Sequence, residues 1–334
     1  MNKRQICRER ERVIGHKLFE EIISPKNLLS AWKEFRKGKR KKQDVQEFEF
    51  KLEDNLFRLH QELEDKTYQP DLYLSFHIQD PKLRHIHKAS VRDRILHQAI
   101  FRILYPIFDK SFIYDSYSSR ADKGTHAGVN RLERFLVKAS QNNHKVVYAL
   151  KCDISKFFDS IDQGILLNLI KKKISDLDTL WLIKTIIKSF EKSPSKGLPL
   201  GNVTSQLFAN IYMNELDQFA KHKLKIKYYI RYADDFIALS SMSAPLIELI
   251  PKIDNFLTTS LKLRLHPNKI IIRKYSQGID FLGYVLRPRH RLLRTKTKRR
   301  LFNKINEKNK PSYLGLLRHG NTYKIKRRID IYPI

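Results

Sequence analysis

Cysteine is nearly absent from this chain of 334 residues, in which Cys7 and Cys152 are the only two. Two cysteines are too few for a disulfide framework or a cysteine-rich zinc site, and this scarcity is typical of a reducing compartment. The chain also lacks any run of about 18 apolar residues, the length that a membrane-spanning helix needs. Residues 1–5 lack the apolar core of a signal peptide. We therefore expect a cytoplasmic protein with no membrane partner.

Acidic residues are scarce relative to basic ones. Asp and Glu number 35 against 66 Lys and Arg, which gives a formal net charge of +31 at pH 7. Such an excess indicates a polyanionic partner, and nucleic acid is favoured over a membrane surface. The excess is greatest near the two ends, with 14 Lys/Arg against 5 Asp/Glu in residues 1–42 and 16 against 2 in residues 287–334. The hydrophobic content of 41% is sufficient for a globular enzyme of two or three subdomains.

Glycine is missing from a stretch whose pattern requires a turn. In Tyr228–Leu239, two runs of aromatic and aliphatic residues flank Asp234 and Asp235, which predicts a β-hairpin with these aspartates at its tip. A two-residue hairpin turn prefers Asn-Gly or Asp-Gly because its central residues often have positive φ. Folding alone therefore does not explain two aspartates. Adjacent carboxylates at a turn can converge on a hard divalent cation, and a solvated Asp-Asp turn is the alternative.

A third carboxylate follows a short apolar strand that we predict at residues 146–150. Lys151 and Cys152 lead from this strand to Asp153. If the strand lies beside the hairpin, Asp153, Asp234 and Asp235 form an acidic cluster. Such a cluster can hold two Mg²⁺ ions about 3.5–4 Å apart, the arrangement used for in-line nucleotidyl transfer. One ion would activate a primer 3′-hydroxyl, and the other would neutralise the pyrophosphate leaving group.

The order of these motifs resembles that of reverse transcriptases. The segment 232–235 (Tyr-Ala-Asp-Asp) is similar to the family signature, and the resemblance covers nearly the whole chain. It implies an α+β right-hand polymerase fold with fingers at 1–140, a palm at 141–286 with a helical insertion at 163–198, and a basic thumb at 287–334. The matching blocks, in the family's order, are Asp153 with Phe158, Gly197–Gln206, the hairpin, Leu265–Lys269 and Phe281–Tyr284.

The resemblance implies an RNA-directed DNA polymerase and assigns roles to single residues. It implies two Mg²⁺ ions, for which Mn²⁺ can substitute, and template RNA, the RNA/cDNA duplex and dNTPs as partners. The catalytic residues that it implies are Asp153, Asp234, Asp235 and Lys269, and Ile154 would join the three aspartates as a metal ligand. The nucleotide-binding residues are Lys82, Arg84, Lys156, Phe157, Phe158, Leu200, Gly201 and Gln206, and the primer grip is Phe281, Leu282, Gly283 and Tyr284.

Four of these roles have alternatives. Lys269 matches the position proposed to protonate pyrophosphate, and an ordinary phosphate contact is equally compatible. Lys82 and Arg84 match positions that meet the incoming triphosphate, where a guanidinium clasps phosphate oxygens bidentately, but they can also be surface charges on an edge strand. Phe158 matches an aromatic residue that lies under the sugar and excludes a 2′-hydroxyl. The alternative is a core phenylalanine, a role that Phe157 can also fill.

The residue before Gly201 departs from the commoner pattern. Retroviral and most group II intron enzymes have glutamine there and Ser-Pro at the end of the motif, whereas this chain has Leu200 and Ser205-Gln206. The departure is similar to the reverse transcriptases of diversity-generating retroelements, which copy a template-repeat RNA, mutate mainly at its adenines, and work with a small basic oligomeric accessory protein. The alternatives are a defence-associated or group II-intron-like bacterial reverse transcriptase and, in another class, a non-catalytic, maturase-like RNA-binding protein.

Helical periodicity and capping residues predict several helices. The expected helices are Val45–Glu64, one capped by Ser90 and continuing through Leu104, one capped near Thr125 and continuing through Leu136, one starting at Asp159 or Ser160, one capped by Asn202 or Thr204 and ending near Lys221, and Leu246–Leu261.

Overall fold

The computed structural model describes residues 17–79 and 83–331 and confirms the α+β class. The chain forms two compact units, each built from three separate segments. Unit 1 comprises Met1–Phe112, Lys156–Glu215 and Thr259–Leu263, and unit 2 comprises Ile113–Ser155, Leu216–Thr258 and Arg264–Ile334. The predicted division into fingers, palm and thumb stays a prediction. Two helices cross the unit boundaries: α11 (Val203–Gln218) and α12 (Ser243–Leu261).

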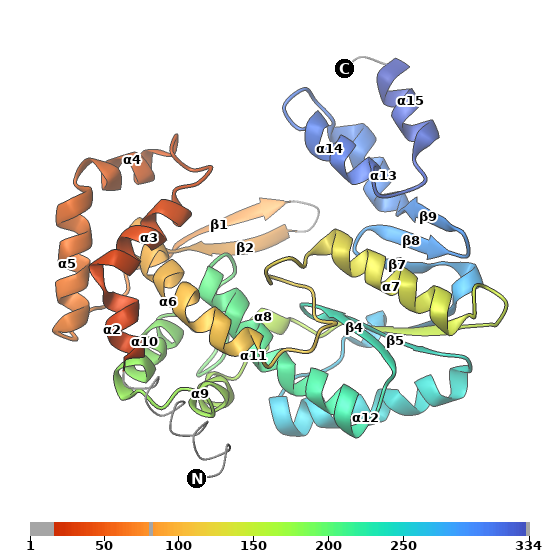
Figure 1. Cartoon of the computed structure of the whole chain (residues 1–334), viewed down its shortest axis with the longest axis horizontal. Helices are drawn as coiled ribbons and strands as arrows, with labels where there is room; N and C mark the ends of the chain where they lie inside the picture. The colour runs from red at the N-terminus through yellow and green to blue at the C-terminus, as the bar shows by residue number, and fades with distance from the viewer. Residues whose placement is uncertain (1–16, 80–82, 332–334) are drawn as a thin grey trace, which may run out of the picture. The chain divides into compact units, whose positions relative to one another are not determined.

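Unit 1 is mainly helical, with one two-stranded antiparallel sheet (Figure 1). As predicted, the Ser90 hydroxyl caps a helix, accepting a hydrogen bond from the Asp93 amide at 3.1 Å. Buried Leu28 and Trp32 belong to the core of this unit. Its elements are α2 (Leu18–Ile23), α3 (Pro25–Phe35), α4 (Gln43–Phe50), α5 (Leu52–Glu64), β1 (Leu74–Gln79), β2 (Leu83–Lys88), α6 (Val91–Asp109), α8 (Phe157–Ser160), α9 (Gln163–Lys171) and α10 (Leu177–Lys188).

Two predicted helix boundaries are wrong. The helix expected over Val45–Glu64 is two helices, because Lys51 (φ −119°, ψ 45°) leaves the helical conformation. The helix expected from Asp159 or Ser160 is the short α8 followed by α9, whose N-terminus is capped by Asp162 through a 2.9 Å bond from the Ile165 amide. The next long helix is capped near Thr125 as predicted: its N-cap is Gly124, whose φ of 104° favours glycine.

Unit 2 contains two antiparallel sheets and the helices that pack on them (Figure 1). The first sheet has the order β4-β5-β3-β6 and the second the order β7-β8-β9. The strands are β3 (Tyr148–Cys152), β4 (Tyr228–Tyr232), β5 (Asp235–Ser240), β6 (Ile271–Lys274), β7 (Ile279–Phe281), β8 (Tyr284–Arg287) and β9 (His290–Leu293). The helices are α7 (Thr125–Ala139), α13 (Thr295–Lys304), α14 (Lys310–Leu317) and α15 (Tyr323–Ile331), with short helical turns at Phe219–Lys223, Pro267–Lys269 and Tyr275–Gln277.

The main core of unit 2 lies between α7 and the sheets. Buried Leu132 and Leu136 of α7 share one hydrophobic cluster with Ile237 and Leu239 of β5 and with Tyr284 of β8. Because side chains alternate along a strand, the residues between these point to the opposite face. The first sheet (β4-β5-β3-β6) therefore packs one apolar face against α7. Tyr229 and Arg231 of β4 point to its other face.

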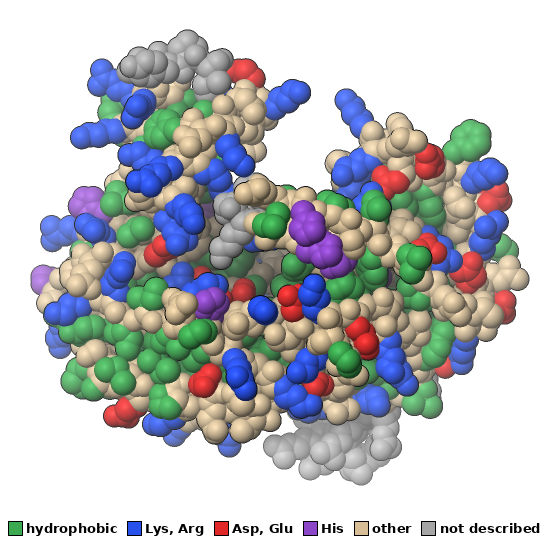
Figure 2. All heavy atoms as spheres, turned by 180° about the vertical axis from the view of Figure 1, so that it is seen from behind, with side chains coloured by type: hydrophobic (Ala, Val, Ile, Leu, Met, Phe, Trp, Pro, Cys, Tyr) green, Lys and Arg blue, Asp and Glu red, His purple; other side chains and the backbone are tan. Residues whose placement is uncertain are grey.

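None of the helices within residues 17–79 and 83–331 is long and apolar enough to span a membrane. Lys and Arg side chains are spread across the face that Figure 2 shows, with fewer acidic side chains between them. This distribution agrees with the large positive charge of the sequence.

Candidate active site

The hairpin predicted around the paired aspartates is present, but its turn lies one residue earlier than expected. Tyr232 of β4 pairs with Asp235 of β5, so Ala233 and Asp234 form the two-residue turn. Ala233 has φ 54°, in the left-handed region. That conformation costs a non-glycine residue on the order of 1 kcal/mol or more, and it persists only where surrounding contacts enforce it. Asp235 is the first residue of β5.

Arg231 supplies such a contact from the strand before the turn. Its Nη1 donates a hydrogen bond to the Ala233 carbonyl oxygen at 3.0 Å. The guanidinium is held by Asp217 in the last turn of α11, with Nε donating to Oδ1 at 2.8 Å and Nη2 to Oδ2 at 2.7 Å. Both side chains have a relative exposure of 0%. The carbonyl oxygen of the turn residue Ala233 is thus bonded to a buried ion pair.

Strand register brings the third carboxylate beside the hairpin. β3 pairs with β5 so that Cys152 is opposite Phe236. Asp153 comes directly after β3, and Asp235 is the first residue of β5. Because the two strands are antiparallel, both residues lie at the same end of the strand pair. Adjacent strands lie about 4.8 Å apart, so these residues are neighbours. The His266 amide donates to the Asp153 carbonyl oxygen at 2.8 Å and anchors this strand end.

The surroundings of Asp235 disfavour its charge. Desolvation raises the pKa of Asp235 to about 6, and nearby Asp153 and Asp234 push it in the same direction, while Lys151 opposes them. The Oδ1 atom of Asp235 is buried and accepts no hydrogen bond. A buried carboxylate oxygen without a partner is costly, and a bound cation would relieve that cost.

Two lysines pair with these carboxylates. The Lys269 amine lies 2.6 Å from Asp153 Oδ1, and the Lys151 amine lies 3.1 Å from Asp235 Oδ2. Lys151 also donates to the Asp280 carbonyl oxygen of β7 at 3.0 Å, which links Asp235 to the strand that ends at Phe281 of the predicted primer grip. Lys269 thus lies next to Asp153, one of the aspartates with which the resemblance to reverse transcriptases groups it as catalytic.

The donor set suits a hard divalent cation. Carboxylate oxygens are the ligands that Mg²⁺ prefers, and mutual repulsion among three aspartates is relieved when a cation binds. Within the described residues, no group of three or more His, Cys, Asp or Glu side chains is already arranged around an ion position. The fit therefore rests on the orphaned Oδ1 of Asp235 and on the proximity of Asp153 and Asp234.

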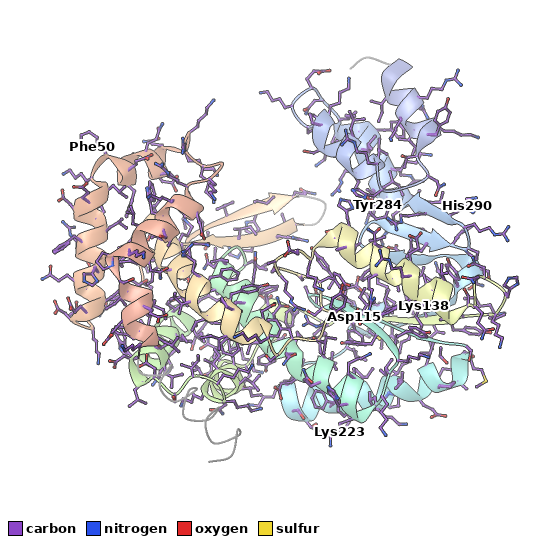
Figure 3. The ribbon with its side chains drawn as sticks, viewed as in Figure 1. Phe50, Asp115, Lys138, Lys223, Tyr284 and His290 are labelled. Atoms are coloured by element: carbon purple, nitrogen blue, oxygen red, sulfur yellow. The ribbon has the colours of Figure 1, made fainter. Side chains whose placement is uncertain are left out.

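The predicted primer-grip residues form a tight turn between β7 and β8. Leu282 (φ 48°) and Gly283 (φ 90°) occupy the turn and are half-buried, whereas Phe281 and Tyr284 are buried in the core of unit 2. The Tyr284 hydroxyl donates to the Leu316 carbonyl oxygen at the end of α14, 2.8 Å away. Figure 3 shows Tyr284 at the start of β8. Leu282 and Gly283 are thus the accessible part of this set.

The residues assigned to the incoming nucleotide belong to unit 1. Gly201 has φ 114°, which favours glycine, and a Cβ atom there would lie 3.7 Å from Ile86 of β2, the strand that carries exposed Arg84. Lys82 lies outside the described residues. The Phe158 carbonyl oxygen accepts a bond from the Leu198 amide at 2.9 Å.

The remaining members of that set differ in exposure. Phe157 is 3% exposed and belongs to the core, while adjacent Phe158 is half-buried. Lys156 and Gln206 are exposed, and Leu200 is half-buried. Phe157 is therefore the core member of the aromatic pair.

Three residues at the site escaped the sequence analysis: Lys151, Asp217 and Arg231. A signal was available for two of them. Lys151 and Arg231 are charged residues inside apolar strand segments, and such residues need a partner. Asp217 gave no signal, because one aspartate in an amphipathic helix normally faces water. Asp115, in the loop before α7 (Figure 3), pairs with Arg131 at 2.7 Å.

Residues 78–286 match the model of the reverse transcriptase (RNA-dependent DNA polymerase) family. Because this match covers more than half of the sequence, the chain belongs to the reverse transcriptase family. Such domains use divalent metal ions, which agrees with the carboxylates described above.

Relatives with 26% sequence identity include the protein YkfC of Escherichia coli, over 65% of each chain, and the group II intron-encoded protein LtrA of Lactococcus lactis, over 71% of this chain and 50% of LtrA. The chain thus spans about half to two thirds of the length of these relatives. Among solved structures, the Candida tropicalis apo telomerase has a TM-score of 0.52 and 15% identity, over 71% of this chain and 50% of the telomerase. This likeness supports the right-hand polymerase fold.

Proposed function

We propose that this chain is an RNA-directed DNA polymerase that makes cDNA by nucleotidyl transfer with two Mg²⁺ ions. One observation carries the proposal: Asp153 and Asp235 lie at the same end of two paired strands, and Asp234 occupies the turn beside them. When bound at such carboxylates, divalent ions activate a 3′-hydroxyl and stabilise the leaving pyrophosphate. Membership of the reverse transcriptase family gives this arrangement its chemical context.

The chain's own residues would prepare this site. Asp153, Asp234 and Asp235, together with Ile154, would hold the ions. The amines of Lys151 and Lys269 keep two of these carboxylates paired, so binding of a cation must displace or share them. A released Lys269 amine can contact phosphate oxygens or donate a proton to them.

Sugar and triphosphate recognition are assigned to unit 1. Arg84 is exposed on β2 and can donate to phosphate oxygens, and we retain Lys82 for the same role. Burial of Phe157 leaves half-buried Phe158 as the aromatic ring available to a sugar, which supports its assignment as the gate against a 2′-hydroxyl. The accessible turn Leu282–Gly283 would contact the primer.

Template RNA and the RNA/cDNA duplex are the proposed partners. The excess of 66 Lys and Arg over 35 Asp and Glu favours a polyanion. A structure related in fold, the telomerase of Candida albicans, with a TM-score of 0.51, is solved in complex with a fragment of telomeric RNA. The proposal extends RNA binding to this chain.

Within this activity, we assign the chain to a diversity-generating retroelement. Leu200 carries the assignment, because it cannot donate the hydrogen bond that a glutamine amide provides before Gly201. The role includes copying a template-repeat RNA with errors at adenines and binding a small basic oligomeric accessory protein. A second candidate is a group II-intron-like reverse transcriptase, which the similarity to LtrA favours.

The experiment compares three enzymes on one RNA template, with sequencing of the cDNA. Asp234→Ala/Asp235→Ala should abolish synthesis. The wild type should misincorporate opposite template adenines, and Leu200→Gln should lower that error rate severalfold, because one discriminating hydrogen bond of about 1–1.5 kcal/mol changes selectivity roughly tenfold.

The outcomes separate the two levels of the proposal. Synthesis by the double alanine variant would overturn the carboxylate mechanism. Faithful wild-type copying of adenines would exclude the retroelement role and leave the group II-intron-like one, while an unchanged error rate in Leu200→Gln would move the cause away from this residue.

A further inference from the structure

The fully buried Arg231 lies three residues before Asp234. Its ion pair with Asp217 has no exposed surface. Removing two charges from water is expensive, and well-packed hydrophobic residues of similar size are often as stabilising or more so. Stability alone is therefore a poor explanation for an arginine at this position.

The guanidinium is clamped before it reaches the turn. Asp217 binds it bidentately and also accepts a hydrogen bond from the Tyr229 hydroxyl at 2.9 Å. The Arg231 side chain further donates from Nη2 to the Ser116 hydroxyl at 3.0 Å. The guanidinium is planar, so its bonds to Asp217 and Ser116 fix its orientation. In this orientation Nη1 donates to the Ala233 carbonyl oxygen.

That carbonyl belongs to the peptide bond that joins Ala233 to Asp234. Because a peptide unit is planar, the direction of its C=O sets ψ of Ala233 and φ of Asp234 together. Ala233 is held at φ 54°, a conformation that an alanine rarely adopts without support. Rotation of this one peptide plane would redirect Asp234 and shift the start of β5 at Asp235.

We propose that Arg231 is a positioning residue, which Asp217 holds in place so that its bond to the Ala233 carbonyl oxygen fixes the turn that aims Asp234 and Asp235. This inference rests on the proposed function, because that function makes these aspartates the metal-binding residues that the turn must aim. Arg231 acts through the turn and contacts no substrate.

The test removes the ion pair without leaving a buried charge. Arg231→Met/Asp217→Leu/Tyr229→Phe replaces the pair with apolar side chains of similar shape and removes the hydroxyl that would lose its acceptor. Tyr229→Phe alone is the matched control, since it keeps Arg231 bonded to both Asp217 and Ala233. Arg231→Lys is a further variant, because lysine keeps the charge near Asp217 and lacks the fork that reaches the carbonyl at the same time.

We expect the triple variant to keep a melting temperature and an RNA affinity close to those of Tyr229→Phe. Its kcat at saturating dNTP and Mg²⁺ should fall about 100-fold, the scale of a displacement of about 1 Å in an active site. The rise in melting temperature on adding Mg²⁺ should shrink, because the carboxylates no longer converge. In Arg231→Lys, kcat and the Mg²⁺-dependent rise in melting temperature should both fall, but by less than in the triple variant. Tyr229→Phe should stay within about threefold of the wild-type kcat.

A folded triple variant with wild-type kcat and an unchanged Mg²⁺-dependent rise in melting temperature would overturn the inference. A merely structural role predicts that activity falls only with the folded fraction, at an unaltered response to Mg²⁺. If the triple variant fails to fold, the same two readouts on Arg231→Lys decide the question. If the wild type extends no primer, the proposed function fails, and the thermal response to Mg²⁺ still tests the positioning role on its own.

Discussion

Phe157 and Phe158 are adjacent phenylalanines with different surroundings. Phe157 is 3% exposed, whereas Phe158 is half-buried and lies 5.3 Å from it, ring centre to ring centre. Because the Phe157 ring already fills the core, the Phe158 ring is available to a ligand. A bulky ring under a sugar leaves no room for a 2′-hydroxyl.

We therefore predict that Phe158→Ala lowers the preference for deoxynucleotides over ribonucleotides by at least tenfold. The measurement is the ratio of kcat/KM for a dNTP and the matching rNTP in single-nucleotide extension. Phe157→Ala is the control. It should cost about 3–5 kcal/mol of unfolding free energy through the cavity it leaves, with no change in that ratio. An unaltered ratio in folded Phe158→Ala would assign the gate to another residue.

At the residue scale, the sequence predicts the carboxylates better than the groups that hold them. Asp153, Asp234 and Asp235 follow or interrupt apolar strands, and that local pattern, together with the family order of motifs, makes them candidates. The pairing of Arg231 with Asp217 could not be predicted, because it depends on how α11 packs against β4. The position of the turn, one residue earlier than predicted, could not be predicted for the same reason, since Ala233 at φ 54° is bonded through its carbonyl oxygen to Arg231 of this pair.

At the element scale, α6 carries a buried titratable group. His97 is 1% exposed and its Nδ1 atom has no hydrogen-bond partner. Desolvation, with a smaller contribution from Arg94, lowers the pKa of His97 to about 4. The folded protein thus keeps this imidazole neutral at pH values at which the unfolded chain, near pKa 6.5, binds a proton.

This difference predicts a loss of stability in acid. Between about pH 6.5 and pH 4 the unfolded state binds more protons at His97, so the unfolding free energy falls as the pH falls, by about 3 kcal/mol over that window. In His97→Gln this part of the pH dependence should disappear. Chemical denaturation at several pH values between 4 and 7.5 measures it, with His144→Gln, which removes an exposed histidine, as control. Equal pH slopes in the wild type and His97→Gln would show that His97 does not titrate in this way.

Helix existence was easier to predict from sequence than helix ends. Ser90 caps α6 as expected, because a serine hydroxyl before an apolar repeat is a local signal. The break at Lys51 between α4 and α5 was missed, because lysine favours helices and the apolar repeat continues across it. There the Asn55 side-chain amide donates to the Phe48 carbonyl oxygen at 3.1 Å, a contact that depends on the folded bend.

At the scale of the whole molecule, the order of the family motifs predicts the fold class. The two compact units, however, are not continuous stretches of the chain. Each unit is assembled from three segments, so the predicted contiguous division into fingers, palm and thumb cannot be read from these boundaries. Packing between distant segments decides membership of a unit, and a single sequence carries little information about such contacts. The net charge, by contrast, depends on composition alone.

The concentration of basic residues in α13 leads to a prediction about RNA binding. Lys296, Lys298 and Arg299 are exposed on this helix. Each phosphate contact releases counterions, so log Kd for RNA should rise steeply with log salt concentration, and each lost contact should reduce that slope by about 0.7–0.9. Replacing the three residues by glutamine should therefore reduce the slope by about 2–3, without changing the melting temperature by more than a few degrees.

The matched control removes the same charge from another part of unit 2. Lys223, Lys225 and Lys227 are exposed beyond α11, and their replacement by glutamine lowers the net charge equally. Filter binding or fluorescence anisotropy at 50–300 mM salt would compare the two triple variants. If α13 contacts phosphates directly, only the α13 triple variant should change the slope of log Kd against log salt concentration by more than about one. Equal changes in both variants would mean that RNA responds to the net positive field of the protein, because a field depends on total charge and not on the place from which charge is removed.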